Sequence, residues 1–178
     1  MRQAVRIGIV GCGLMGRTHA ETLRMLPGAT IRAACDVQPA AAEDLATTYG
    51  APDAYATEDA ALLFGDESLD AVLICTWHDS HYPLAMAALA SGKHVFIEKP
   101  LAFTAGQCRA IEAAGRAAGR LVVTGFFARF APAVQQVRAA GLRPIAMVGQ
   151  MSSPRWARDF WAQDPHLGGG NVFSQGCH

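Results

Sequence analysis

The sequence predicts an α/β fold built on a doubly wound parallel sheet. Short apolar runs rich in valine and isoleucine alternate with longer stretches in which apolar residues recur at the helical period. Glycine, proline or an N-capping residue marks most of the boundaries between them. This alternation is typical of strand–helix–strand units, whose strands lie parallel beneath covering helices. A six-stranded unit would be complete by residue 125, so we expect a first domain over residues 1–125.

The strands and the first two helices are predicted from apolar runs and from the breakers that end them. The predicted strands are residues 6–10, 30–35, 53–56, 71–75, 94–97 and 121–124, of which the third is the weakest. The first helix is predicted over residues 14–26 because Pro27 and Gly28 stop it. The second opens at Pro39, which the first turn of a helix tolerates, and ends before Gly50.

Three further helices are predicted from their capping residues. A side-chain oxygen at the N-cap can accept a hydrogen bond from the unpaired N–H groups of the first turn. Acidic residues in that turn also suit the helix dipole. The predicted caps are Thr57 for the helix after the third strand, Asp79 or Ser80 for the helix after the fourth, and a capping box of Thr104 with Gln107 for the helix after the fifth.

The last 53 residues depart from this alternation. Residues 133–140 are predicted as a helix, 145–151 as a strand and 152–170 as a loop, with a new helix starting near the end. One helix and one strand bury too little apolar surface to form an independent domain. We therefore expect residues 126–178 to be the start of a second domain that is truncated in this chain. The alternative is an appendage packed on the first domain.

Charge and composition exclude several classes of function. The 178 residues include 15 basic and 15 acidic side chains, so we expect no binding of nucleic acid or anionic membrane through bulk charge. An apolar content of 51% is too high for a disordered chain, yet no run reaches the roughly 20 residues of a membrane span. The five cysteines are scattered and the N-terminus has no secretory pattern. We therefore expect reduced thiols in a cytoplasmic protein.

A glycine-rich loop follows the first predicted strand and opens the first helix. It fits the pattern G-x-G-x-x-G, which in this context is typical of a dinucleotide-binding Rossmann fold. The first glycine permits a tight turn, the second lets the backbone approach a diphosphate, and the third allows close contact between helix and strand. The candidate cofactor-binding residues in this loop are Gly11, Cys12, Gly13, Leu14, Met15 and Gly16.

Asp36 ends the second predicted strand, 20 residues after Gly16. A carboxylate at this place can accept hydrogen bonds from the ribose hydroxyls of the adenosine half of a dinucleotide. It would repel the 2′-phosphate of NADP, and the following Val37 and Gln38 offer no cation to offset that repulsion. We therefore expect NAD rather than NADP as the cofactor. FAD ranks lower, because its site usually needs more chain than this.

Glu98, Lys99 and Pro100 follow the fifth predicted strand, at the edge where open α/β sheets bind ligands. Pro100 biases Lys99 away from helical geometry and permits a cis peptide bond between them. Unlike arginine, a lysine in a crevice can be tuned to pass a proton. One interpretation is therefore a catalytic lysine. The other is a solvated strand-end lysine paired with Glu98.

The stretch from Cys75 to His81 contains three potential metal ligands, Cys75, His78 and His81, with Asp79 as a fourth. They would have to converge across a strand–helix turn, so we expect no metal site and interpret the polar residues as caps. Trp161 lies in the predicted loop. His19 is interpreted as an ordinary packing or surface residue. Gly168, Gly169 and Gly170 are either plain loop or a place where backbone approaches the substrate.

Several of these motifs together resemble the Gfo/Idh/MocA oxidoreductase family. They are Gly11 to Gly16, Thr76 with His81, residues 90–95, Glu98-Lys99-Pro100 and Arg129-Phe130, and the similarity continues through the glycine triplet to His178. The resemblance implies an enzyme of about twice this length with a second, substrate-binding domain. It also implies hydride transfer between a nicotinamide and a sugar or polyol carbon, with Thr76, His81 and Glu98 near the cofactor.

The resemblance further implies roles for individual residues. The lysine of the family corresponds to Lys99, which would hydrogen-bond the substrate oxygen and stabilise negative charge. The family's D-x-x-x-H pair corresponds to Ser174 and His178, one helical turn apart, and His178 would be the general acid or base. Ser174 departs from the usual aspartate, which puts this pair in doubt. Trp77 departs from the usual proline and either shapes the pocket or simply packs.

The function expected from the sequence is therefore an NAD-dependent oxidoreductase acting on a secondary alcohol of a sugar, inositol or related polyol. One alternative is a nucleotide-binding module without catalysis. Another is NAD-assisted glycoside cleavage or epimerisation without net redox change. The expected partner is a small-molecule sugar or polyol, with no nucleic acid and no membrane, and the full-length protein is expected to be a homo-oligomer. Weak candidates for substrate contact are Trp77, Arg129, Trp161 and Ser174.

Overall fold

The centre of the fold is a six-stranded sheet with strand order β3-β2-β1-β4-β5-β6. The computed structural model describes residues 4–143, 145–146, 148–150, 152 and 155–177. The strands are β1 (Val5–Val10), β2 (Ala29–Cys35), β3 (Tyr55–Thr57), β4 (Ala71–Ile74), β5 (His94–Ile97) and β6 (Val122–Thr124). Every neighbouring pair in this sheet runs parallel. The predicted doubly wound parallel sheet is therefore confirmed, including its weak third strand.

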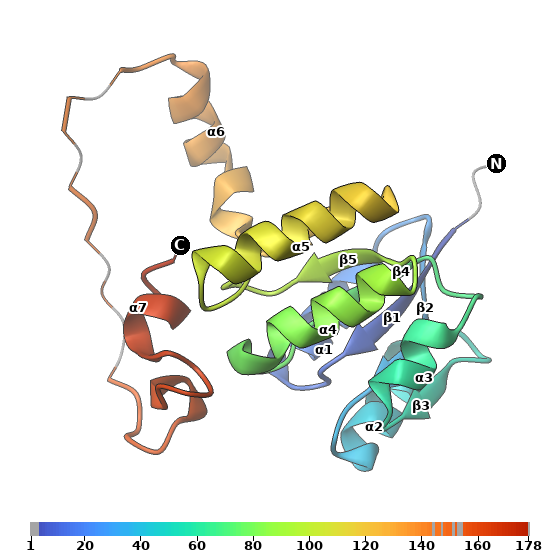
Figure 1. The fold of residues 1–178 in the computed structure, drawn as a ribbon. Helices are drawn as coiled ribbons and strands as arrows, with labels where there is room; N and C mark the ends of the chain where they lie inside the picture. Colours follow the sequence, from blue (N-terminus) through green and yellow to red (C-terminus); the bar gives the residue numbers. More distant parts are fainter. Residues whose placement is uncertain (1–3, 144, 147, 151, 153–154, 178) are drawn as a thin grey trace.

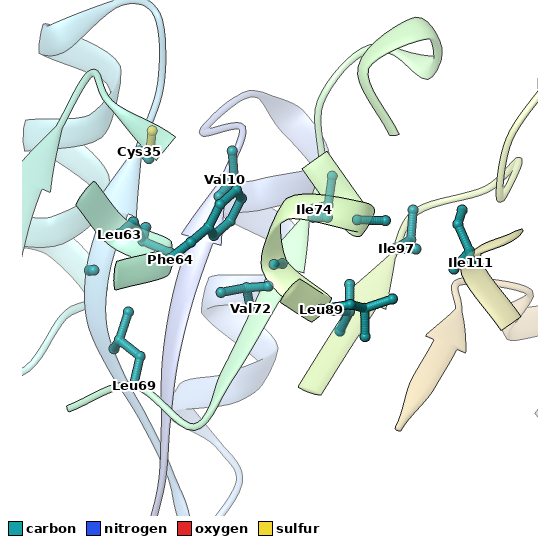
Figure 2. Packing of buried hydrophobic residues seen from close by; sticks show 14 of the residues in the cluster. Val10, Cys35, Leu63, Phe64, Leu69, Val72, Ile74, Leu89, Ile97 and Ile111 are labelled. Carbon is teal, nitrogen blue, oxygen red and sulfur yellow. The ribbon is translucent and has the colours of Figure 1, made fainter. Parts of the chain in front are cut away.

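Helices cover both faces of the sheet (Figure 1). One face is covered by α1 (Leu14–Arg24) and α2 (Pro39–Tyr49), and the other by α3 (Ala60–Gly65), α4 (His78–Ala90) and α5 (Ala105–Ala118). Figure 2 shows the core on the second face, where Leu63, Leu89 and Ile111 from the three helices join Val72, Ile74 and Ile97 from the strands. Full burial of each such side chain stabilises the fold by about 1.5–3 kcal/mol.

The chain leaves the centre of the sheet in two directions. β1 pairs with β2 on one side and with β4 on the other. The connection after β1 therefore passes over one face and the connection after β4 over the opposite face. Such a reversal opens a crevice at the carboxyl ends of the two central strands, which is where α/β sheets bind ligands.

Two of the predicted helix caps are wrong and one is confirmed. The Asp59 side chain, not Thr57, caps α3 by accepting a hydrogen bond from Ala61 N, because Thr57 belongs to β3. The N-cap of α4 is Trp77, so Asp79 and Ser80 lie inside the first turn of that helix. In both places a competing polar residue stood within two or three positions of the true cap. The capping box of Thr104 and Gln107 on α5 is present as predicted.

The chain after β6 is only partly regular. It contains a short 3-10 helix η1 (Phe127–Phe130), α6 (Pro132–Ala139), a second 3-10 helix η2 (Trp161–Gln163) and α7 (Gly170–Ser174). Figure 1 shows α6 projecting from the sheet and an extended connection returning to α7. The strand predicted at residues 145–151 is wrong for its described residues, which form no ladder. The reason is that Ile145 and Val148 are exposed and meet no neighbouring strand with which to pair.

In the part of the chain that the structure describes, no helix combines the length and the apolar character needed to span a membrane.

Candidate active site

Three glycines shape the loop between β1 and α1. Gly11 has a φ of +93°, and a Cβ added there would lie 2.6 Å from the backbone carbonyl of Cys75. A Cβ on Gly16 would lie 2.0 Å from Gly11 O, so α1 packs directly onto the loop. By contrast, a Cβ on Gly13 would have no heavy atom within 4 Å beyond its chain neighbours. The loop is thus closed toward the protein and open at Gly13, as a phosphate-binding turn must be.

The N-terminus of α1 lies beside this opening. Its N-cap is Gly13, which has no side chain to accept a hydrogen bond from the N–H groups of the first turn. The Leu14 side chain is exposed and Met15 is partly buried. Because the N–H groups of a first turn have no partner within the helix, they and the positive end of the helix dipole are available to an anion. These residues could therefore hold the diphosphate of a dinucleotide.

Asp36 joins the glycine loop to the end of β2. Its Oδ2 accepts a hydrogen bond from Cys12 N (2.7 Å), and its Oδ1 accepts one from Gln38 N (2.9 Å). Each carboxylate oxygen can accept a further bond, so the group remains able to bind ribose hydroxyls. The N–H of Cys12 is directed to Asp36 rather than to the open side of the loop. The buried Cys12 thiol faces Cys35 O, and burial raises its pKa to about 12, so it stays neutral.

Lys99 lies at the carboxyl end of β5, beside one of the two central strands. Its peptide bond to Pro100 is cis. The side chain is partly buried, and its Nζ donates a hydrogen bond to Ser174 O at 3.1 Å. An ammonium group has three N–H donors, so this contact leaves two that could bind a substrate oxygen.

Glu98 is buried and is held from two directions. Its Oε1 accepts a hydrogen bond from His19 Nε2 (2.7 Å), and its Oε2 accepts one from Lys99 N (3.0 Å). Burial raises the pKa of Glu98, but the bonds from His19 and Lys99 N outweigh it, so the pKa lies below its ordinary value. Glu98 therefore remains a carboxylate, and each of its oxygens accepts a hydrogen bond from a protein group. Its expected place near the cofactor stays a prediction.

Thr76 and His81 organise the turn between β4 and α4. His81 is fully buried, with its Nδ1 2.7 Å from Pro100 O and its Nε2 3.2 Å from Thr76 O. With no exposed surface, His81 ties the β4–α4 turn to the segment after β5. Its expected place near the cofactor stays a prediction. The Thr76 hydroxyl accepts a hydrogen bond from Ser80 Oγ at 2.7 Å.

Aromatic side chains attach the segment around η2 to the start of α4. Trp77 and Trp161 stack with ring centroids 5.8 Å apart and an interplanar angle of 12°. His78 stands edge-on to Trp161, and its Nδ1 lies 2.7 Å from Gly168 O. Trp77 remains 50% exposed, so one side of the stacked pair is open to solvent.

The packing of Gly168 and the contacts of His78 and His81 bear on the substrate-approach and metal-site interpretations made from the sequence. A Cβ on Gly168 would lie 2.2 Å from Ala162 Cα, so this glycine allows two protein segments to pack rather than a substrate to approach. Nδ1 of His78 and both imidazole nitrogens of His81 already face backbone carbonyls. Within the described ranges, no group of three or more histidine, cysteine, aspartate or glutamate side chains is arranged to hold a metal ion.

Of the expected pair of Ser174 and His178, the structure describes Ser174. His178 lies outside the described residues. Ser174 is 2% exposed, and its buried Oγ has no hydrogen-bond partner. α7 ends at Ser174, and Gln175 leaves helical geometry. The expected contact of Ser174 with substrate stays a prediction. It is the Ser174 carbonyl that meets Lys99.

Arg129 is exposed on η1, after the edge strand β6, and its expected contact with substrate stays a prediction. His19 is not an ordinary surface residue but the partner of Glu98, from which it is separated by 79 positions. The local sequence shows only that His19 lies one helical turn after Gly16, and this does not reveal a partner as distant in the chain as Glu98.

We expect stability to fall in mild acid because of His78. The pKa of His78 is lowered from 6.5 to about 4, chiefly by burial, and the neighbouring His81 and Lys99 act in the same direction. The hydrogen bond to Gly168 and the charge of Asp79 act in the opposite direction but are outweighed. The unfolded chain therefore takes up the proton first as the pH falls. The contribution of neutral His78 to the free energy of unfolding is complete above pH 6.5 and is lost as the pH approaches 4. From pH 7.5 to 5 the loss is about 2 kcal/mol.

Urea unfolding at the two pH values measures this loss. The control variant is His78→Asn, whose amide can still donate to Gly168 O but does not titrate. It should lose about 2 kcal/mol less than the unchanged protein between the same pH values. Equal losses in both proteins would contradict the assignment to His78.

Comparison with known proteins identifies relatives of the first part of the chain. The model of the GFO_IDH_MocA family, described as "Oxidoreductase family, NAD-binding Rossmann fold", matches residues 5–126. Inositol 2-dehydrogenases from Paracoccus denitrificans and Acidothermus cellulolyticus are 39% and 40% identical to the chain over 138 and 139 residues. These alignments cover 76% and 77% of this chain but only 41% and 40% of the relatives. The chain thus spans about two fifths of their length.

Solved structures show the same fold with a nicotinamide cofactor. GenD2 from gentamicin A biosynthesis, solved with NAD, has a TM-score of 0.86 and 26% identity; the match covers 100% of this chain and 52% of GenD2. The myo-inositol dehydrogenase from Lactobacillus casei, solved with NAD(H) and myo-inositol, has a TM-score of 0.72 and 28% identity; that match covers 78% of this chain and 41% of the dehydrogenase. The glycine loop and Asp36 therefore belong to an NAD-binding Rossmann fold.

Proposed function

Because the chain belongs to the GFO_IDH_MocA family of oxidoreductases, we propose that the protein transfers a hydride between NAD and a secondary alcohol of a sugar, inositol or related polyol. The observation that carries this proposal is the position of Lys99. Lys99 follows β5, so it lies at the same edge of the parallel sheet as the glycine loop that follows β1, and its ammonium keeps two donors for a substrate oxygen.

The residues around the glycine loop fit NAD. The open side at Gly13 and the uncapped first turn of α1 would receive the diphosphate, and Asp36 would bind the adenosine ribose. A hollow of about 300 Å³ adjoins Asp36 and includes Glu43 and Glu58 in its lining. A 2′-phosphate beside Asp36 would therefore approach three carboxylates, which favours NAD over NADP.

In this proposal the side chains handle the proton and the charge on oxygen. NAD, when bound, supplies the hydride acceptor at its nicotinamide ring. Lys99 would donate a hydrogen bond to the alcohol oxygen and stabilise the negative charge that develops there. His178 would take the proton from the hydroxyl group; this role is carried over from the family resemblance, and the residue lies outside the described part. The exposed side of Trp77, with Trp161 stacked behind it, would form one wall of the substrate pocket.

We also propose a division of labour along the chain. Residues 1–125 would form the NAD-binding domain, and residues 126–178 would begin the part that binds substrate. The contacts from η2 and α7 to Trp77, His78 and Lys99 support this view, because they bring the later segment to the edge of the cofactor domain. Assembly into a homo-oligomer stays a prediction.

Incubation of the intact protein with NAD and a panel of cyclitols, aldoses and sugar alcohols tests the proposed reaction. We expect reduced nicotinamide to accumulate with at least one member, in an amount equal to the ketone formed. Epimerised or cleaved product without accumulation of reduced nicotinamide would instead support a cycle without net redox change. Binding of NAD without turnover of any member would support a non-catalytic nucleotide-binding module.

A further inference from the structure

His19 and Glu98 form a buried contact that the proposed reaction does not use. His19 comes from the middle of α1 and Glu98 follows β5, yet His19 Nε2 lies 2.7 Å from Glu98 Oε1. Glu98 is only 5% exposed. Burial of a carboxylate is costly unless it is paired and hydrogen-bonded, so a buried glutamate at the edge of a ligand crevice requires a reason.

The second oxygen of Glu98 gives that reason. Oε2 accepts the backbone N–H of Lys99 at 3.0 Å, while Oε1 accepts the bond from His19. The carboxylate therefore bridges two groups, one oxygen for each. One group belongs to the helix that begins at the glycine loop, and the other is the backbone of the proposed catalytic lysine.

The surrounding residues leave this bridge little freedom. The His19 ring stands edge-on to Phe96 of β5, with ring centroids 5.0 Å apart. A Cβ on Gly125 would lie 3.1 Å from Glu98 Oε1, so the backbone after β6 closes the other side of the carboxylate. Gly125 N in turn donates to Ile97 O at 2.8 Å. The carboxylate is thus enclosed by α1, by β5 and by the chain after β6.

We propose that His19 is a positioning residue that acts through Glu98 to fix Lys99 relative to the helix that begins at the glycine loop. This inference rests on the proposed function, in which that loop holds NAD and Lys99 contacts the substrate oxygen. The nicotinamide that would accept the hydride and the ammonium that would stabilise charge on the substrate oxygen must keep a fixed separation, because a displacement of about 1 Å can reduce the rate roughly 100-fold. Glu98 connects α1, which begins at the glycine loop, with the backbone of Lys99.

The direct test measures the Lys99 backbone amide. In the intact protein labelled with ¹⁵N-lysine, the exchange rate of the Lys99 N–H is compared among His19→Phe, His19→Gln and Ile111→Val, with the resonance assigned from Lys99→Arg. Phenylalanine fills the space of the imidazole without a donor, whereas the glutamine amide can still donate to Glu98. Ile111 is a fully buried residue of α5 outside the site, and its shortening controls for a general loss of stability.

We expect exchange of the Lys99 amide to be faster by a factor on the order of ten in His19→Phe, and near its original rate in His19→Gln and Ile111→Val. Turnover of the active panel compound should follow the same order, with the KM for NAD nearly unchanged. Unchanged exchange in His19→Phe, or an equal increase in Ile111→Val, would overturn the inference. Unchanged turnover in Lys99→Ala would instead overturn the proposed function.

Discussion

Replacement of Lys99 by alanine is expected to lower the turnover of the intact protein by a factor on the order of 100 or more. The affinity for NAD should stay within about twofold, because Lys99 lies beyond the glycine loop and Asp36, which would hold the cofactor. The loss would fall on turnover, since the ammonium stabilises a charge that develops only as the alcohol oxygen loses its proton. Steady-state kinetics with the active panel compound, together with calorimetric titration of NAD, measure the two quantities separately.

The other lysine of the chain is a matched control. Lys93 lies immediately before β5, whereas Lys99 lies after it. The buried Nζ of Lys93 donates hydrogen bonds to Leu69 O (2.9 Å) and Asp66 O, at the end of the strands opposite to Lys99. Lys93→Met keeps the apolar stem and removes the donors, so it should lower the melting temperature without changing turnover. A similar fall in turnover for both variants would show that the effect of Lys99 is one of folding.

Much of the fold, and the places of several candidate site residues within it, were predictable because their signals are local. The glycine loop, Asp36 and Lys99 each stand at the end of an apolar run, and the carboxyl ends of parallel strands share one edge of the sheet. Knowing that a run is a strand therefore also gives the place of the residue that follows it. The same reasoning failed at the caps of α3 and α4, because several polar residues near each helix start could serve as the cap and the local sequence does not choose among them.

The contacts that hold the site together were not predictable for a physical reason. His19 and Glu98 meet only because α1 crosses the sheet near the end of β5, and nothing in either local sequence records that crossing. The stacking of Trp77 on Trp161 depends likewise on how a long irregular segment returns to α4. The described residues between 145 and 151 form no strand despite the apolar Ile145 and Val148, since a strand exists only beside a partner.

In the glycine loop, one substitution is expected to lower the affinity for NAD strongly without changing the stability of the fold. Gly13 has φ −72° and ψ −160°, a conformation that alanine adopts readily, and a Cβ there meets no protein atom within 4 Å beyond its chain neighbours. Gly13→Ala should therefore fold with an unchanged melting temperature. The added methyl group would stand on the side of the loop where the diphosphate must approach. The affinity for NAD should fall by a factor on the order of 100, which corresponds to about 2.7 kcal/mol.

Two other glycines test whether this loss arises from the open side of the loop. In Gly16→Ala the Cβ would lie 2.0 Å from the carbonyl oxygen of Gly11, so the loop must shift and both the melting temperature and the NAD affinity should fall. Gly65 ends α3 with nothing within 4 Å of its Cβ position, and Gly65→Ala should change neither. Thermal unfolding and calorimetric titration of the three variants give these quantities. If Gly13→Ala bound NAD as tightly as the unchanged protein, the diphosphate could not lie against this loop, and the role assigned to Asp36 would fail with it.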